Sequence, residues 1–86
     1  MAIAVYTVGA DNIRIKQMHE IADAWGFAGQ FMDCRALLND ARKKRFDTVL
    51  LIDPEALDDK TKAELATLKI EIIGFNDRKK LEKKVL

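Results

Sequence analysis

The sequence has no serine at any of its 86 positions, which excludes every reaction that depends on a serine nucleophile. A single histidine, His19, excludes metal sites built from histidine pairs and catalysis by two imidazoles. A single cysteine, Cys34, excludes an intramolecular disulfide. The apolar runs are too short to span a bilayer, and the first residues lack the pattern of a signal peptide. We therefore expect a cytoplasmic protein with no membrane association.

The chain also lacks a strong excess of charge of either sign, since 15 Lys and Arg stand against 14 Asp and Glu. A dedicated nucleic-acid module would be strongly basic, so this balance predicts no general electrostatic partner. What the sequence does contain is 49% hydrophobic and 34% charged residues. That composition predicts one small globular domain over residues 1–86.

Four apolar segments rich in β-branched residues predict strands, at residues 3–8, 28–32, 48–52 and 70–74. Each is followed by a segment whose apolar residues recur every three or four positions, which predicts a helix. Because the connections are short, right-handed crossovers should place all four strands in one parallel sheet. We predict an α/β fold: a small three-layer sandwich with a four-stranded parallel sheet in the order 2-1-3-4, of the flavodoxin-like kind.

Capping residues mark where the predicted helices begin and end. The N-cap candidates are Asp11 or Asn12, Asp33, Asp53 and Asn76. The first helix is predicted over residues 13–25, and Gly26 follows it in the position of a C-cap. Proline directly after Asp53 predicts that the third helix begins at Pro54 and continues to Leu68. A final basic helix is expected after the last cap.

Three of these aspartates, Asp11, Asp33 and Asp53, follow the ends of three successive predicted strands. The carboxyl ends of parallel strands share one edge, so these carboxylates can approach one another and hold Mg²⁺ through oxygen ligands. This arrangement resembles a response-regulator receiver. The simpler interpretation, which we favour, is that each aspartate caps a helix and that the domain has no cofactor.

Three further residues have a structural interpretation beside a functional one. Cys34 follows a strand and precedes a helix, where a reactive thiol would stand, but no second cysteine or positioned histidine accompanies it. We expect a small, half-buried thiol. His19 is expected at the surface, paired with water, and Trp25 is expected in the core because it continues the apolar stripe of the first helix.

Two clusters of basic residues follow the second and the last predicted helix. The first is Arg42, Lys43, Lys44 and Arg45, and the second is Lys79, Lys80, Lys83 and Lys84. Both are expected near the edge of the sheet opposite the aspartates, where cations complement the helix dipoles. They form either a basic patch for weak DNA binding or, as we favour, an ordinary solvated surface, since Phe46 is the one aromatic residue among them.

Four segments match, in order along the chain, the elements of one known protein family. They are Val5-Tyr6-Thr7-Val8-Gly9-Ala10, Gln17 with Trp25-Gly26, Phe31-Met32-Asp33 and Asp47-Thr48-Val49-Leu50-Leu51-Ile52-Asp53. Together they resemble the N-terminal catalytic domain of the serine recombinases, the resolvase/invertase family, over about residues 3–76. The resemblance implies a single resolvase-like α/β domain.

The departures from that family fall on its catalytic residues. Val8 stands at the motif arginine and Ala10 at the nucleophilic serine, while Pro54 and Leu57 stand at two further arginines and Asp53 is retained. Phosphoryl transfer requires a nucleophile and positive charge around the phosphate oxygens. The resemblance therefore implies a catalytically inactive domain, not an enzyme, linked to a mobile element or to site-specific DNA recombination.

Such a domain would act by binding another protein. The candidate surface for this partner is the last predicted helix, whose apolar residues are Leu81, Val85 and Leu86. Two alternatives stay open: a receiver-like or flavodoxin-like domain that binds Mg²⁺ or a small ligand at the three aspartates, and weak DNA binding through the basic clusters.

Overall fold

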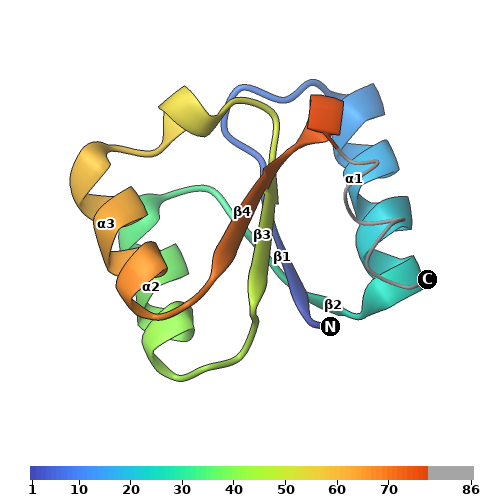
Figure 1. Cartoon of the computed structure of the whole chain (residues 1–86). Helices are drawn as coiled ribbons and strands as arrows, with labels where there is room; N and C mark the ends of the chain where they lie inside the picture. Colours follow the sequence, from blue (N-terminus) through green and yellow to red (C-terminus); the bar gives the residue numbers. More distant parts are fainter. Residues whose placement is uncertain (78–86) are drawn as a thin grey trace.

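The computed structural model describes residues 1–77, and these form a parallel β-sheet with helices on both faces (Figure 1). The strands are β1 (Ile3–Tyr6), β2 (Phe27–Phe31), β3 (Thr48–Leu51) and β4 (Glu71–Gly74). Their order in the sheet is β2-β1-β3-β4, and every neighbouring pair is parallel. The predicted α/β class, strand number and strand order are confirmed.

The helices are α1 (Asn12–Trp25), α2 (Cys34–Arg42) and α3 (Asp59–Thr67), with short 3₁₀ turns η1 (Pro54–Ala56) and η2 (Phe75–Asp77). Helix α1 covers one face of the sheet, and α2 and α3 lie together on the other (Figure 1). Within residues 1–77 the helices are too short and too polar to cross a lipid bilayer. The predicted last helix falls outside the described residues.

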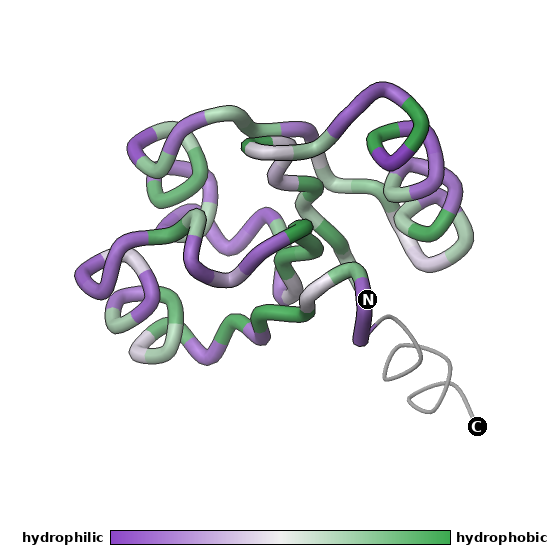
Figure 2. The backbone as a smooth tube through the Cα atoms, turned by 90° about the horizontal axis from the view of Figure 1, so that it is seen from above, coloured by the Kyte–Doolittle hydropathy of each residue, from purple (hydrophilic) through white to green (hydrophobic). Residues whose placement is uncertain are grey.

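The central strands β1 and β3 are buried along their whole length, as continuous aliphatic runs predict. Successive side chains of a strand point to opposite faces. Ala4 and Tyr6 of β1 therefore pack in the cluster beneath α2 and α3, whereas Ile3 and Val5 pack beneath α1 with Met18. In Figure 2 the hydrophobic segments accordingly gather in the middle of the molecule, and the hydrophilic ones lie at its periphery.

Most predicted element ends agree with the structure to within one or two residues. Asp11 caps α1 and Asp33 caps α2, and Gly26 ends α1 with a φ of 128°. Strand β1 ends at Tyr6 rather than at position 8, and β2 lies one residue earlier than predicted. These shifts leave Val8 and Met32 in loops rather than in strands.

The predicted start of the third helix is wrong. Asp53 and Pro54 do begin a helical turn, but this turn is the 3₁₀ segment η1, and α3 begins only at Asp59. Between them Leu57 has an extended backbone and only 2% of its surface exposed. Asp58 is the true N-cap, since its carboxylate accepts the Thr61 N–H at 2.7 Å. Burial of Leu57 and this second cap together interrupt the helix.

Two lysines adopt a backbone conformation that glycine usually occupies. Lys44 has a φ of 57° and Lys69 a φ of 61°, and each follows the C-cap residue of a helix, α2 and α3 respectively. At this position a left-handed residue ends the helix, and a Cβ makes that conformation unfavourable by about 1 kcal/mol. Both helices thus end in a mildly strained turn.

We predict that Lys44→Gly and Lys69→Gly each raise the free energy of unfolding by about 0.5–1 kcal/mol, because glycine removes the strain of the left-handed turn. Urea denaturation followed by circular dichroism measures the change. Lys43→Gly is the matched control: Lys43 has a φ of −85°, so glycine there only adds flexibility and should lower stability. Equal effects at positions 43 and 44 would contradict this explanation.

Candidate functional site

The loops that follow the strands lie at one edge of the sheet, at the top of Figure 1, which we call the carboxyl edge. In open parallel sheets, ligands bind at this edge, close to the place where the strand order reverses. Here that place lies between β1 and β3, whose chains continue toward opposite sides of the sheet. The loops after β1, β2 and β3 are therefore the candidate site.

The three aspartates at this edge cap helical turns. Asp11 Oδ1 accepts the Arg14 N–H at 2.8 Å, and Asp33 Oδ1 accepts the Ala36 N–H at 2.8 Å. Asp53 Oδ1 accepts the Glu55 N–H at 3.0 Å. Across residues 1–77, no group of three His, Cys, Asp or Glu side chains is placed to hold a metal ion. The capping interpretation is confirmed, and the structure does not bring these carboxylates together.

Three large apolar side chains are exposed at the carboxyl edge, and we call them the apolar edge patch: Val8, Ile13 and Met32. Their exposed fractions are 38%, 73% and 72%. Val8 and Met32 follow adjacent strands, and the Thr7 N–H joins their loops by donating to the Phe31 carbonyl at 3.0 Å. Isolated exposed apolar residues are common, but these three all stand at the edge that normally binds ligands.

The apolar edge patch is not predicted by the sequence pattern, because Val8 and Met32 continue the apolar runs of two predicted strands. Ile13 carried a signal that could have been used. It lies five positions before the buried Met18, so it does not share the three-or-four spacing of the buried stripe. An isoleucine away from the stripe on an amphipathic helix is expected to face solvent.

In the resemblance to the serine recombinases, five positions of this chain correspond to catalytic residues, and four of the five carry apolar side chains. Val8 is exposed, whereas Ala10 packs against the cluster beneath α1. Pro54 is the first residue of η1, and Leu57 is buried in the cluster beneath α2 and α3. Asp53 is engaged in capping. These five positions offer no cation and no nucleophilic hydroxyl or thiol.

Cys34 is half-buried, as expected, and its Sγ lies 3.5 Å from the hydroxyl oxygen of Tyr6. Burial of the Tyr6 ring, together with this hydrogen bond, raises the pKa of the phenol well above its ordinary value of 10.0. Tyr6 therefore stays protonated and fills the core beneath α2. Trp25, expected in the core, is half-buried and packs against the cluster beneath α1.

His19 differs from the prediction that it pairs with water. Its Nε2 is hydrogen-bonded to the Gln30 Oε1 of β2, and its ring packs against Phe27 with the centroids 4.7 Å apart. The physical reason is the position of α1, which packs over β1 and β2 and brings His19 against the edge strand. His19 is a contact between helix and sheet.

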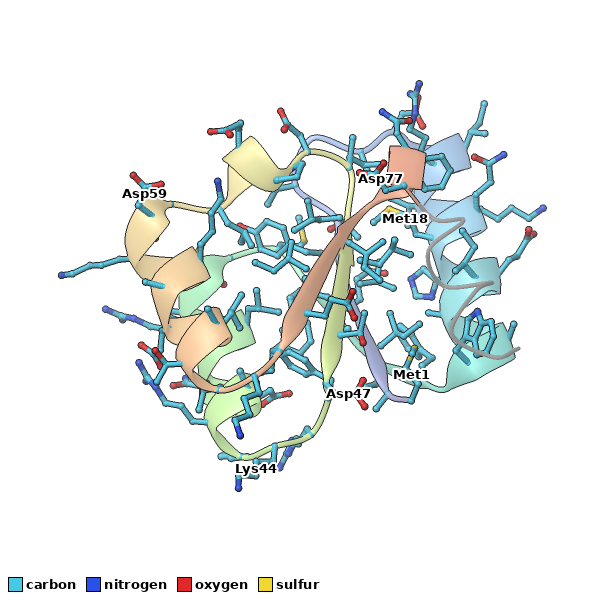
Figure 3. The ribbon with its side chains drawn as sticks, in the orientation of Figure 1. Met1, Met18, Lys44, Asp47, Asp59 and Asp77 are labelled. Atoms are coloured by element: carbon cyan, nitrogen blue, oxygen red, sulfur yellow. The ribbon has the colours of Figure 1, made fainter. Side chains whose placement is uncertain are left out.

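The first basic cluster lies at the opposite edge of the sheet, as expected, and Figure 3 shows Lys44 and Asp77 at opposite ends of the molecule. Arg42 forms a two-point ion pair with Glu64 of α3, at 2.6 and 2.9 Å. Arg45 lies 3.7 Å from Asp40. Half of the cluster is thus paired with carboxylates, which favours the solvated surface over a DNA patch. The second cluster, Lys79, Lys80, Lys83 and Lys84, lies outside the described residues.

A pocket of about 290 Å³ opens at this same edge, between the ends of α2 and α3. It is lined by Ala2, Lys44, Phe46, Asp47, Leu68, Lys69 and Ile70. Helices α2 and α3 direct their negative carboxyl ends toward this region, and the Asp47 carboxylate adds to them. The two lysines offset that negative charge, so the pocket does not indicate an anion site.

No protein-family model matches the chain, and neither curated proteins nor solved structures give a significant match. The resemblance to the serine recombinases therefore stays a prediction from the sequence. The residues expected to contact a partner, Leu81, Val85 and Leu86, lie outside the described part of the chain.

We predict that the stability of the domain falls as the pH falls below about 5, partly through Asp58 and Glu64. The hydrogen bonds from Thr61 lower the pKa of Asp58 below 3.8, and the hydrogen bond from Arg42 lowers the pKa of Glu64 below 4.5. A lowered pKa in the folded state stabilises above the ordinary value, and this contribution is lost as pH falls through the folded-state value.

Urea denaturation of the wild type and Glu64→Gln between about pH 7 and pH 2.5 checks this. The variant should be less stable at neutral pH, and the difference should vanish at the acid end. Glu20→Gln is the control, because Glu20 is exposed on α1 and forms no ion pair among the described residues. A difference that persists unchanged at the lowest pH would contradict the assignment to Glu64.

We also predict that millimolar Mg²⁺ leaves the amide NMR signals around Asp11, Asp33 and Asp53 unchanged. Each carboxylate accepts a hydrogen bond from its own turn, and within residues 1–77 no group of three acidic side chains is placed to hold one ion. A NaCl titration at equal ionic strength corrects for screening. Saturable shifts at all three aspartates would contradict the capping assignment and restore the receiver-like hypothesis.

Proposed function

We propose that this chain is a catalytically inactive, resolvase-like domain that binds another protein through the apolar edge patch of Val8, Ile13 and Met32. The observation that carries the proposal is the exposure of Ile13 and Met32, 73% and 72%, at the carboxyl edge. The proposed setting, taken from the resemblance, is a cytoplasmic protein linked to a mobile element or to site-specific recombination.

The character of the carboxyl edge supports binding rather than catalysis. Transfer of a phosphoryl group needs cations around the phosphate oxygens and an activated nucleophile. Val8, Ala10 and Leu57 supply neither. Leu57 is buried, so this part of the segment after β3 packs into the core. What this edge presents to solvent instead is exposed apolar side chains among the capping aspartates.

The energetics of the apolar edge patch favour a protein as the ligand. Covering a large aliphatic side chain contributes about 1.5–3 kcal/mol, so Ile13 and Met32 would each contribute to an interface that extends along the carboxyl edge. The Asp11–Arg14 ion pair, at 2.8 Å, and the exposed Asp33 surround them with polar groups. Apolar centres with polar rims are the usual composition of protein–protein interfaces.

We predict that Ile13→Lys combined with Met32→Lys abolishes binding of the partner, because two charges would then be buried in the interface. The tagged chain is used to capture proteins from its host cells, and the retained proteins are quantified by mass spectrometry. A specific partner should fall at least about tenfold with this double variant.

The matched control is Ala63→Lys combined with Ala66→Lys, which adds the same charges at two exposed positions of α3. Thermal unfolding should show that both double variants remain folded. The proposal is wrong if no protein distinguishes the wild type from the Ile13/Met32 variant, or if the control loses the partner equally.

A further inference from the structure

A second surface is the outer side of strand β2, which ends one residue before Met32 of the apolar edge patch. Among the described residues β2 pairs only with β1, so it is an edge of the sheet. The Phe31 carbonyl accepts the Thr7 N–H and therefore faces β1. Since backbone groups alternate along a strand, the N–H and carbonyl of Gln30 face outward, and within residues 1–77 they have no hydrogen-bond partner.

Strand β2 lacks the charged side chains and proline that often prevent an edge strand from pairing, and its irregularity is a bulge at Ala28, where its pairing with β1 shifts register. Residues 27–32 contain no charged side chain and no proline. The other edge strand, β4, carries Glu71 and follows Lys69. Sheets usually protect their edges with lysine, proline or inward-pointing charge. The unprotected backbone of β2 is thus suited to accept another strand.

Helix α1 places one positive and one negative side chain beside this edge. His19 contacts both Phe27 and Gln30, so the ridge of α1 that contains His19 lies over β2. Lys16 and Asp23 stand three positions before and four positions after His19, which puts them on the same ridge. Both are exposed, and neither forms an ion pair with another described residue.

We propose that β2 pairs antiparallel with β2 of a second copy of this chain, joining two sheets into one around a two-fold axis. In this arrangement the two α1 helices lie side by side and run in opposite directions. Lys16 of each copy then faces Asp23 of the other, so the ion pair forms twice. The association uses the outer side of β2, whereas Val8 and Ile13 of the apolar edge patch lie outside this strand.

The order of charges on α1 is what selects a second copy as the occupant. A positive residue at one end of a ridge and a negative residue at the other are complementary to the same ridge reversed. Strand β2 has no charged side chain, so it pairs with β2 of the second copy without like-charge repulsion. A foreign strand would satisfy the Gln30 backbone but would leave Lys16 and Asp23 without this match.

Sedimentation equilibrium between about 20 µM and 1 mM tests the association, because a short strand contact is expected to be weak. Lys16→Glu and Asp23→Lys should each weaken dimerisation about tenfold, since each converts two attractive pairs into repulsive ones. The double variant exchanges the charges and should restore the affinity. Lys60→Glu, the same change on the exposed surface of α3, should have no effect.

Hydrogen exchange of the Gln30 amide provides the second measurement. Exchange should be fast in the dilute monomer and slow as the concentration rises. The proposal fails if the chain remains monomeric at about 1 mM, or if a dimer forms that ignores the charge substitutions. It also fails if Gln30 is protected equally at every concentration, because the chain would then cover its own edge.

Discussion

Burial of β1 and β3 on both faces is the constraint on which the rest of the structure depends. Every residue of these two strands is withdrawn from solvent, which requires helices on each side of the sheet. With all strands parallel, each helix must return the chain to the opposite edge. Helix starts therefore gather at the carboxyl edge and helix ends at the other, whatever side chains the loops carry.

This topology explains why Asp11, Asp33 and Asp53 stand at one edge and Arg42 and Lys44 at the other. Helix N-termini attract Asp as a cap, and helix C-termini attract cations. Asp11, Asp33 and Asp53 satisfy local N–H groups, and Arg42 and Lys44 follow the same rule at the far end of α2. The positions of these capping aspartates and of the basic residues that end α2 both follow from parallel packing.

The fold could be predicted from the sequence because hydrophobic periodicity reports burial directly, and burial determines strand order in so small a sheet. The start of α3 could not, since Pro54 and Asp58 both offer good helix starts and only the burial of Leu57 decides between them. The hydrogen-bond partner of His19 could not be predicted either, because it depends on where α1 crosses β2. Periodicity also says little about which apolar residues of a loop, such as Met32, remain exposed.

Leu57 shows that an apolar residue in the loops of the carboxyl edge can belong to the core. In the resemblance to the serine recombinases, Leu57 stands at the position of a catalytic arginine. It packs in the cluster beneath α2 and α3 with 2% of its surface exposed. A guanidinium at this position would be removed from water without a partner, which is strongly unfavourable. The extended backbone at Leu57 also separates η1 from α3, so the burial of this side chain fixes the path of the loop. An arginine placed here would therefore disturb the fold, because the side chain at this position of the segment after β3 is part of the core.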